Sequence, residues 1–139
     1  MTASYWLLKS EPGTYSFANL LKDKRTNWNG IRNFQARNFL RQMAPGDIAL
    51  IYHSGDDKAV VGVAKVVKAA YQDPDPEGGD WSQIDLQPVR ELPAPVPLKQ
   101  IKATPVLKDL LLVRHTRLSV MPVSTAHYKA LLKLGGVAS

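Results

Sequence analysis

The chain has 139 residues, of which 45% are hydrophobic, and this is enough to form the core of one domain. It has no cysteine, which excludes disulfides, thiolate nucleophiles and cysteine-based zinc sites, and no run of about 18 apolar residues that could cross a membrane. Eighteen Lys and Arg residues against twelve Asp and Glu residues give a net charge of +6, and a basic surface favours polyanions such as nucleic acids.

The first half of the chain is predicted to contain two strands and two short helices within one domain over residues 1–139. Residues 1–4 form no charged and apolar leader, so we expect no signal peptide and a cytoplasmic protein. Ser16 is a good N-cap for one helix, and Asn33 is a good N-cap for a second helix that Pro45 and Gly46 end. The predicted elements are a strand over residues 5–8, a helix from Ser16 to about residue 22, a charged linker over 22–25, a helix over 35–43 and a buried strand over 48–52.

The second half is predicted to be richer in strands, and the first of them, over 59–67, is predicted to form an antiparallel hairpin with the strand over 48–52. Gly62 lies inside a predicted strand and indicates a bulge or a close approach, and Pro88 indicates an edge or a bend. The predicted elements are strands over 59–67 and 81–92, an extended segment over 93–97, helices over 98–102 and 105–112, a closing strand over 118–120, and a helix that begins after Ser124 and ends at Gly135. We therefore expect an α+β protein, a small, partly open β-barrel of five or six mainly antiparallel strands flanked by short helices.

Residues 28–38 are unusually rich in side chains that recognise nucleic acid. They include two Arg, three Asn, one Gln, one Trp and one Phe. Arg, Asn and Gln hydrogen-bond base edges and phosphates, and aromatic rings stack on bases. We expect Trp28, beside a glycine in a polar loop, to line a cleft, and Trp6 and Tyr52 to lie in the core. The alternative is a capped surface helix with solvated arginines and a buried Trp28.

Nothing in the sequence specifically supports catalysis or a metal site. His53, His115 and His127 lack the spacing of metal ligands, and Ser54 beside His53 is no part of a catalytic-triad motif. The chain contains no glycine-rich phosphate-binding motif. The carboxylates cluster over residues 73–85, and we expect that loop to be solvated. The sequence therefore predicts neither a cofactor nor a metal.

Four motifs follow one another in the chain. They are Y-W-L-L-K-S-E-P from Tyr5, W-x-G-I-R-N-F-Q-A-R-N-F-L from Trp28, G-D at Gly46 leading to Y-H-S at Tyr52, and R-x-x-R-L-S-V-x-P from Arg114. This order resembles the EVE domain family over essentially the whole chain. The resemblance implies a PUA-like fold and a non-enzymatic reader of modified bases in DNA or RNA, such as methylated or hydroxymethylated cytosine, without a cofactor and without a membrane partner.

The resemblance also implies where a base would bind, between the K-S-E-P strand end, the W-x-G-x-R-N loop and the Y-H-S strand end. The base-pocket residues carried over onto this sequence are Lys9, Ser10, Trp28, Ile31, Asn33, His53 and Ser54. Five arginines at or near motif positions are expected to contact the nucleic-acid backbone: Arg32, Arg37, Arg41, Arg114 and Arg117. The loop between Tyr71 and Trp81 is shorter than in eukaryotic members of the family. Phe34 stands at a position where the family motif can also have Tyr, so this chain lacks the hydroxyl but keeps a ring that can stack.

Two other functions stay open from the residues. One is an enzyme acting on a nucleobase or nucleotide with His53 as general base and Glu11 as the nearest second group. The other is a small-molecule or protein-interaction module that uses the same pocket. Binding to that module would be insensitive to salt, whereas phosphate contacts are salt-dependent.

Overall fold

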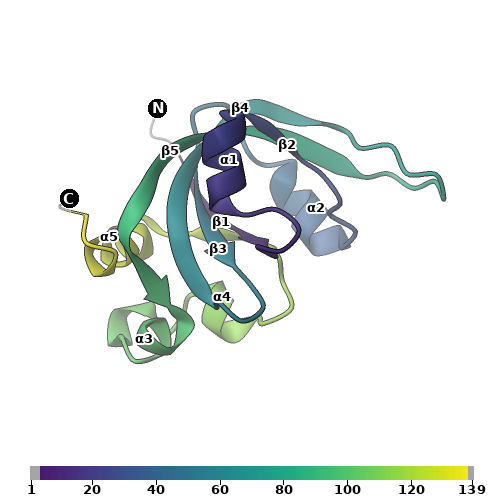
Figure 1. Cartoon of the computed structure of the whole chain (residues 1–139). Helices are drawn as coiled ribbons and strands as arrows, with labels where there is room; N and C mark the ends of the chain where they lie inside the picture. Colours follow the sequence, from purple (N-terminus) through teal and green to yellow (C-terminus); the bar gives the residue numbers. More distant parts are fainter. Residues whose placement is uncertain (1–3, 138–139) are drawn as a thin grey trace.

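A computed structural model describes residues 4–137 (Figure 1). Residues 1–3 and 138–139 of the predicted domain, and with them most of the segment on which the expectation about a leader rests, lie outside the described part. No helix within residues 4–137 is long and apolar enough to cross a membrane. The strands are β1 (Tyr5–Ser10), β2 (Thr26–Trp28), β3 (Ile48–His53), β4 (Ala59–Gln72), β5 (Ser82–Pro97) and β6 (Val120–Val123). The helices are α1 (Phe17–Asp23), α2 (Phe34–Leu40), α3 (Leu98–Lys102), the 3-10 helix η1 (Pro105–Leu107), α4 (Leu111–Arg114) and α5 (Thr125–Leu134).

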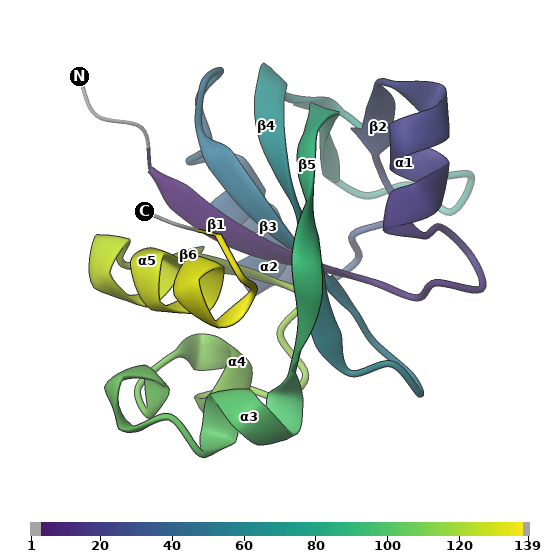
Figure 2. The ribbon, with the colours of Figure 1, turned by 60° about the vertical axis from the view of Figure 1, so that its left-hand side comes forward.

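The six strands form one mixed sheet in the order β2-β5-β4-β3-β1-β6. β1 runs parallel to β3, and every other neighbouring pair is antiparallel. The sheet is not closed into a barrel, because β2 pairs only with β5 and β6 pairs only with β1. The predicted α+β class with six mainly antiparallel strands is therefore confirmed, in an open form. In Figure 2, α3, α4 and α5 gather at one end of the molecule, away from α1.

The core lies on the central strands, where the sequence has its longest apolar runs. Leu7 and Leu8 of β1 and Leu50 of β3 are fully buried, and Trp6 and Tyr52 are buried as predicted. Trp6 Nε1 donates a hydrogen bond to Asp47 Oδ2 at 3.0 Å, and the backbone N–H groups of two further residues donate to the same carboxylate. These bonds satisfy the buried Asp47, which would otherwise oppose folding.

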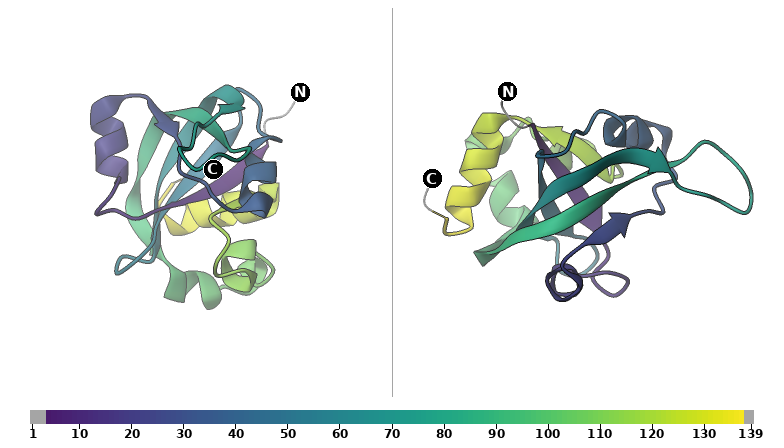
Figure 3. Two further views of the ribbon diagram at one scale, coloured as in Figure 1. Left: turned by 90° about the vertical axis from the view of Figure 1, so that its right-hand side faces the viewer. Right: turned by 90° about the horizontal axis from the view of Figure 1, so that it is seen from above.

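The β4–β5 hairpin reaches beyond the rest of the sheet (Figures 1 and 3). Its register shifts at Gly62, where an added Cβ would lie 2.5 Å from the Phe17 ring, so the predicted close approach is real. Both strands are longer than predicted. β5 continues through the prolines to Pro97, and β4 is the one strand that borders this half of it, since β2 pairs with β5 only at residues 84–86. We call residues 73–81, between the two strands, the hairpin tip.

Other element bounds differ from the sequence-based expectation. The three-residue β2 was not predicted, because an edge strand this short shows no alternation of apolar residues. α2 ends at Leu40 instead of residue 43, and the helix predicted over 105–112 is split into η1 and α4. The closing strand is β6, at 120–123, where edge position tolerates Pro122. Ser16, Asn33 and Ser124 cap their helices as predicted.

Candidate nucleic-acid interface

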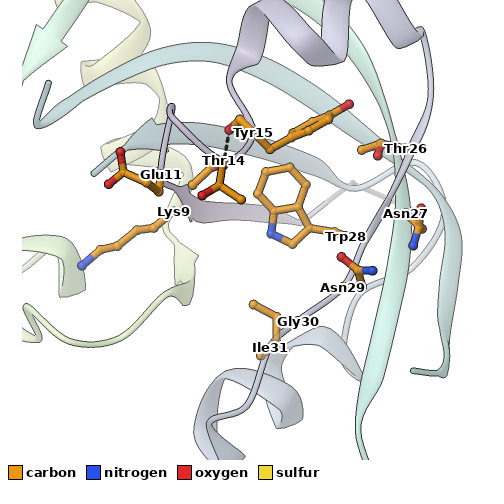
Figure 4. A pocket seen from close by; sticks show the side chains of 11 residues that line it. Lys9, Glu11, Thr14, Tyr15, Thr26, Asn27, Trp28, Asn29, Gly30 and Ile31 are labelled. Atoms are coloured by element: carbon orange, nitrogen blue, oxygen red, sulfur yellow. Dashed lines mark hydrogen bonds between the residues drawn. The ribbon is translucent and has the colours of Figure 1, made fainter. Parts of the chain in front are cut away.

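The main pocket lies between the end of β1, the turn that leads into α1, and β2 with the loop after it (Figure 4). Its volume is about 430 Å³. β3, β4 and β5 separate β1 from β2 in the sheet order, so the curvature of the sheet brings these two strands to one pocket. The lining residues are Lys9, Ser10, Glu11, Thr14, Tyr15, Thr26, Asn27, Trp28, Asn29, Gly30 and Ile31.

Trp28 and Tyr15 form the aromatic part of the main pocket. Their ring centroids are 6.1 Å apart and the rings are nearly perpendicular, at 85°. Trp28 is only 7% exposed, so it is both a core residue and a pocket wall, and each of the two sequence-based interpretations was half correct. The Tyr15 hydroxyl donates to Asp23 Oδ2 at 2.8 Å, and burial is the main reason that the pKa of Tyr15 is raised. Packing in the core therefore holds Trp28 in place, and the hydrogen bond to Asp23 holds Tyr15.

Lys9 and Ser10 bring the end of β1 to the main pocket. Lys9 Nζ donates to the carbonyl oxygen of Thr116 at 2.7 Å, and its partial burial lowers its pKa from 10.5. The Ser10 hydroxyl donates to the carbonyl oxygen of Tyr15, which holds the turn closed beneath the aromatic wall. Lys9 also borders a smaller hollow that contains Ser54, so this lysine lies between the two cavities.

Asn33, His53 and Ser54 do not line the main pocket. The Asn33 amide oxygen accepts from Ala36 N–H at 2.9 Å and caps α2. His53 is 8% exposed; its Nε2 accepts from Phe17 N–H at 3.0 Å, and its Nδ1 lies 3.2 Å from Asp57 Oδ2. These contacts make Nδ1 the protonated nitrogen and join the end of β3 to the start of α1. The Ser54 hydroxyl likewise donates a hydrogen bond to the backbone oxygen of Ser10.

The hairpin tip pairs its carboxylates with arginines that follow β2. Arg32 Nη1 lies 2.9 Å from Asp73 Oδ2, and Arg32 Nε lies 2.8 Å from Asp75 Oδ2. Arg41 lies 2.7 Å from Asp80. The expectation that the acidic loop is solvated holds for most of it, including Asp80, whose side chain is 71% exposed, but not for Asp73, which is 5% exposed. Each of these three carboxylates has a guanidinium partner.

The pKa values of two carboxyl groups at the hairpin tip reflect these contacts. Burial alone would raise the pKa of Asp73, but the hydrogen bonds from Arg32 and from Gly30 N–H outweigh it, and the pKa falls below 3.8. The pKa of Asp75 is lowered by the hydrogen bond from Glu77 N–H and then by Arg32. Both groups are thus held ionised at neutral pH.

The other arginines differ in whether a carboxylate neutralises them. Arg114 pairs with Asp109 at 3.1 Å. Arg37 donates to the backbone oxygen of Asp80 at 3.1 Å and to the Asn38 side chain. Within residues 4–137, neither Arg37 nor Arg117 forms an ion pair with a carboxylate.

A model of the EVE domain family matches residues 4–134. The chain belongs to the EVE domain family. This EVE domain is 34% identical to chicken thymocyte nuclear protein 1, an alignment that covers 96% of the chain and 69% of the relative. It superposes with a TM-score of 0.94 on a crystal structure from Agrobacterium tumefaciens that is 39% identical, covering 99% of this chain and 96% of the other.

Human thymocyte nuclear protein 1 has been crystallised in complex with DNA that contains 5-methylcytosine. That structure is 32% identical to this EVE domain, with a TM-score of 0.86, and the match covers 99% of this chain and all of the other. The likeness therefore extends across both chains rather than over one motif.

The site residues expected for an EVE domain fall into two groups in this structure. Lys9, Ser10, Trp28 and Ile31 line the main pocket, whereas the remaining three lie outside it. Among the other lining residues, Glu11 was considered only for the enzymatic alternative, and Asn29 and Gly30 belong to the W-x-G-x-R-N loop that was expected to border the pocket. The lining residues that sequence reasoning missed are Thr14, Tyr15, Thr26 and Asn27. Of these, Tyr15 is the one aromatic residue, and the sequence shows it between the Pro12-Gly13 turn and the Ser16 cap.

Proposed function

We propose that this EVE domain is a non-enzymatic module that binds DNA and reads a modified cytosine in the main pocket. The observation that carries the proposal is the human relative's complex with 5-methylcytosine DNA, because the crystallised chain in that complex matches 99% of this chain. The relatives are named nuclear proteins, and a cytoplasmic location for this protein stays a prediction.

The main pocket has the size and chemistry that a single base requires. Its volume of about 430 Å³ lies within the range of roughly 300–1,000 Å³ that is usual for small-ligand pockets. Trp28 supplies an aromatic surface beside a base that is flipped out or already single-stranded. Asn29 is exposed and its side chain forms no hydrogen bond within residues 4–137, so both its donor and its acceptor are free for the polar edge of the base.

A methyl group on the base would be recognised by apolar contact. Full burial of one such group contributes about 0.8 kcal/mol, which corresponds to roughly a fourfold preference. This modest discrimination suits a reader that finds a modification among many unmodified bases on DNA it already binds.

The phosphate contacts are proposed for basic residues whose charge is not already neutralised. Lys9, Arg37 and Arg117 have no carboxylate partner within residues 4–137. At Arg32, Arg41 and Arg114 a phosphate would compete with the carboxylates that these side chains contact. We therefore expect the first three to contribute more to the salt dependence of binding than the other three.

The contacts of His53 support a binding module rather than an enzyme. A general base needs a free nitrogen within reach of the substrate. His53 is buried, its Nε2 already accepts from Phe17 N–H, and its Nδ1 faces Asp57. If His53→Gln abolished turnover of a nucleoside substrate, the proposal would be wrong.

The deciding experiment is a binding titration at two salt concentrations. Each oligonucleotide, as a single strand or duplex of DNA or RNA, carries one central cytosine, 5-methylcytosine, 5-hydroxymethylcytosine or thymine. We expect salt-dependent binding to DNA with a preference for a modified cytosine. No binding to any member at low salt would refute the proposal, and salt-insensitive binding of a small molecule would favour an interaction module instead.

Asn29 allows a sharper version of the same titration. 5-Methylcytosine and thymine share the methyl group and differ at the polar edge, so the ratio of their affinities reports the hydrogen bonds alone. Asn29→Ala should reduce this ratio, which corresponds to a loss of up to about 1–3 kcal/mol of discrimination, and should leave the ratio of the affinities for 5-methylcytosine and cytosine unchanged. Gln42→Ala, which removes an exposed amide outside the main pocket, is the matched control.

A further inference from the structure

A second aromatic feature lies outside the main pocket, between α2 and the hairpin tip. The rings of Phe34 and Trp81 are stacked, with centroids 5.2 Å apart and planes 18° from parallel. The Phe34 side chain is 65% exposed, the highest value among the exposed large hydrophobic residues of the described chain. Exposing this much aromatic surface contributes nothing to the core, so the stack calls for another explanation.

Several contacts hold the stack in place. An ideal Cβ on Gly79 would lie 2.5 Å from Trp81 Nε1, so the backbone of the hairpin tip lies close against the indole. The Arg32 guanidinium carbon lies 5.4 Å from the Trp81 ring centroid, and that of Arg37 lies 5.0 Å from the Phe34 centroid. Both arginines are fixed by their own hydrogen bonds to the hairpin tip. The rings therefore form a preorganised surface rather than two mobile side chains.

The stack also adjoins the main pocket along the chain. Gly30 and Ile31 line the pocket, Arg32 follows, and Phe34 begins α2. Figures 1 and 3 show α2 beside the β4–β5 hairpin, consistent with the ring contact. A nucleic-acid strand that places one base in the main pocket would thus pass close to this surface.

We propose that the Phe34–Trp81 stack is a second nucleobase site, which receives a base adjacent in the strand to the one in the main pocket. This inference rests on the proposed function. Aromatic platforms of this kind bind bases with little sequence preference, because every base has a face that can stack. Asp73, Asp75 and Asp80 offset the charge of Arg32 and Arg41 around the rings, which favours a base on the rings themselves. Arg37 lies over both rings and has no carboxylate partner within residues 4–137, so it is placed to contact the phosphate of the same nucleotide.

The test combines a protein change with a DNA change. The probe is a short single strand with one central 5-methylcytosine, either intact or with an abasic site on its 5′ or 3′ side. With intact DNA, Phe34→Ala should weaken binding about tenfold at both salt concentrations, since stacking involves no counterion release. With the abasic site on the correct side, the same variant should cause no further loss. Phe34→Trp should restore binding, and Val106→Ala, at another exposed hydrophobic residue, should change nothing.

The outcomes separate this inference from the proposed function. If the wild-type domain binds and prefers 5-methylcytosine but Phe34→Ala binds equally well, only the second site is refuted. Equal losses on intact and both abasic strands would also refute it, because the ring would then not contact the neighbouring base. If Phe34→Ala and the abasic site interact as expected but no modified base is preferred, the second site stands and the reading of modification fails. Absence of any wild-type binding refutes both.

Discussion

Arg32 and Asp73 form an ion pair that joins the hairpin tip to the wall of the main pocket. Arg32 Nη1 lies 2.9 Å from Asp73 Oδ2, and the same oxygen accepts from Gly30 N–H at 2.9 Å. Gly30 has a φ of +81°, a conformation that glycine adopts without strain, so the pocket loop turns sharply at this contact. One buried carboxylate thus connects a pocket-lining residue to a loop more than forty residues further along the chain.

The first prediction concerns that carboxylate. Asp73→Ala should lower the free energy of unfolding by about 1–3 kcal/mol, because Gly30 N–H loses its partner. It should also weaken DNA binding, because the pocket loop is no longer held. Urea denaturation and the titration described above measure the two effects. Glu77→Ala, an exposed change at the same hairpin tip, is the control, and equal effects of the two variants would contradict the assigned role.

The stability of the domain should also depend on acid pH. Burial alone would raise the pKa of Asp85, but hydrogen bonds from Tyr71 and Arg25 outweigh it and the pKa is lowered. The pKa values of Asp73, Asp75 and Asp85 are thus all lowered from 3.8. Between that value and the lowered folded-state values, the unfolded chain binds more protons than the folded chain. The contribution of these three carboxylates to the free energy of unfolding is therefore fully present above about pH 3.8, and it is lost as the pH falls through their lowered folded-state pKa values. Thermal unfolding between pH 2 and 6 should show this decline, less steeply in Asp73→Ala.

The third prediction separates folding from base recognition at Trp28. Because this side chain is 7% exposed, Trp28→Ala should cost about 3–5 kcal/mol of stability, and its binding loss would be hard to interpret. Trp28→Phe keeps an apolar ring against Tyr15 and should stay folded. We expect it to reduce the preference for 5-methylcytosine over cytosine while keeping its affinity for unmodified DNA, because the smaller ring covers less of the methyl group. Equal losses for both oligonucleotides would mean that Trp28 does not contact the modified base.

The fourth prediction concerns the backbone contacts. Arg37→Ala should weaken binding to all DNA sequences by a similar factor and reduce the salt slope by about 1, since one phosphate contact is lost. Arg41→Ala should have a smaller effect on the slope, because Asp80 already neutralises that guanidinium. Identical slopes for Arg37→Ala and the wild type would exclude Arg37 as a phosphate contact.

The last prediction concerns stability alone. Asp47 accepts from Trp6 Nε1 and from two backbone N–H groups, and it is buried. Asp47→Ala leaves these donors without a partner and should destabilise the domain by about 2–4 kcal/mol in urea denaturation. Asp56→Ala, at an exposed carboxylate in the β3–β4 turn, should change the midpoint little.

Much of the fold is local in origin and could be predicted. Helix caps at Ser16, Asn33 and Ser124 act within four residues, so the sequence next to them is sufficient to identify them. The central strands follow from short apolar runs, and the family follows from four ordered motifs. Part of the pocket, including Trp28, was predicted from the composition of residues 28–38 and from the resemblance to the EVE domain family.

The remainder depended on contacts between distant segments, which no local pattern encodes. The sequence by itself determined most of the elements, the central part of the core and the polar, aromatic character of residues 28–38. Only the tertiary structure decided that β2 is a strand and that Asn33 and His53 form hydrogen bonds with the backbone of the protein. It also decided that Arg32 and Arg41 form ion pairs with carboxylates and that Phe34 stacks on Trp81. The physical reason is that the charge and hydrogen-bonding capacity of a side chain are properties of its residue type, whereas the partner that satisfies them depends on which distant segment the fold places beside it, as the hairpin tip lies beside Gly30 and Arg32.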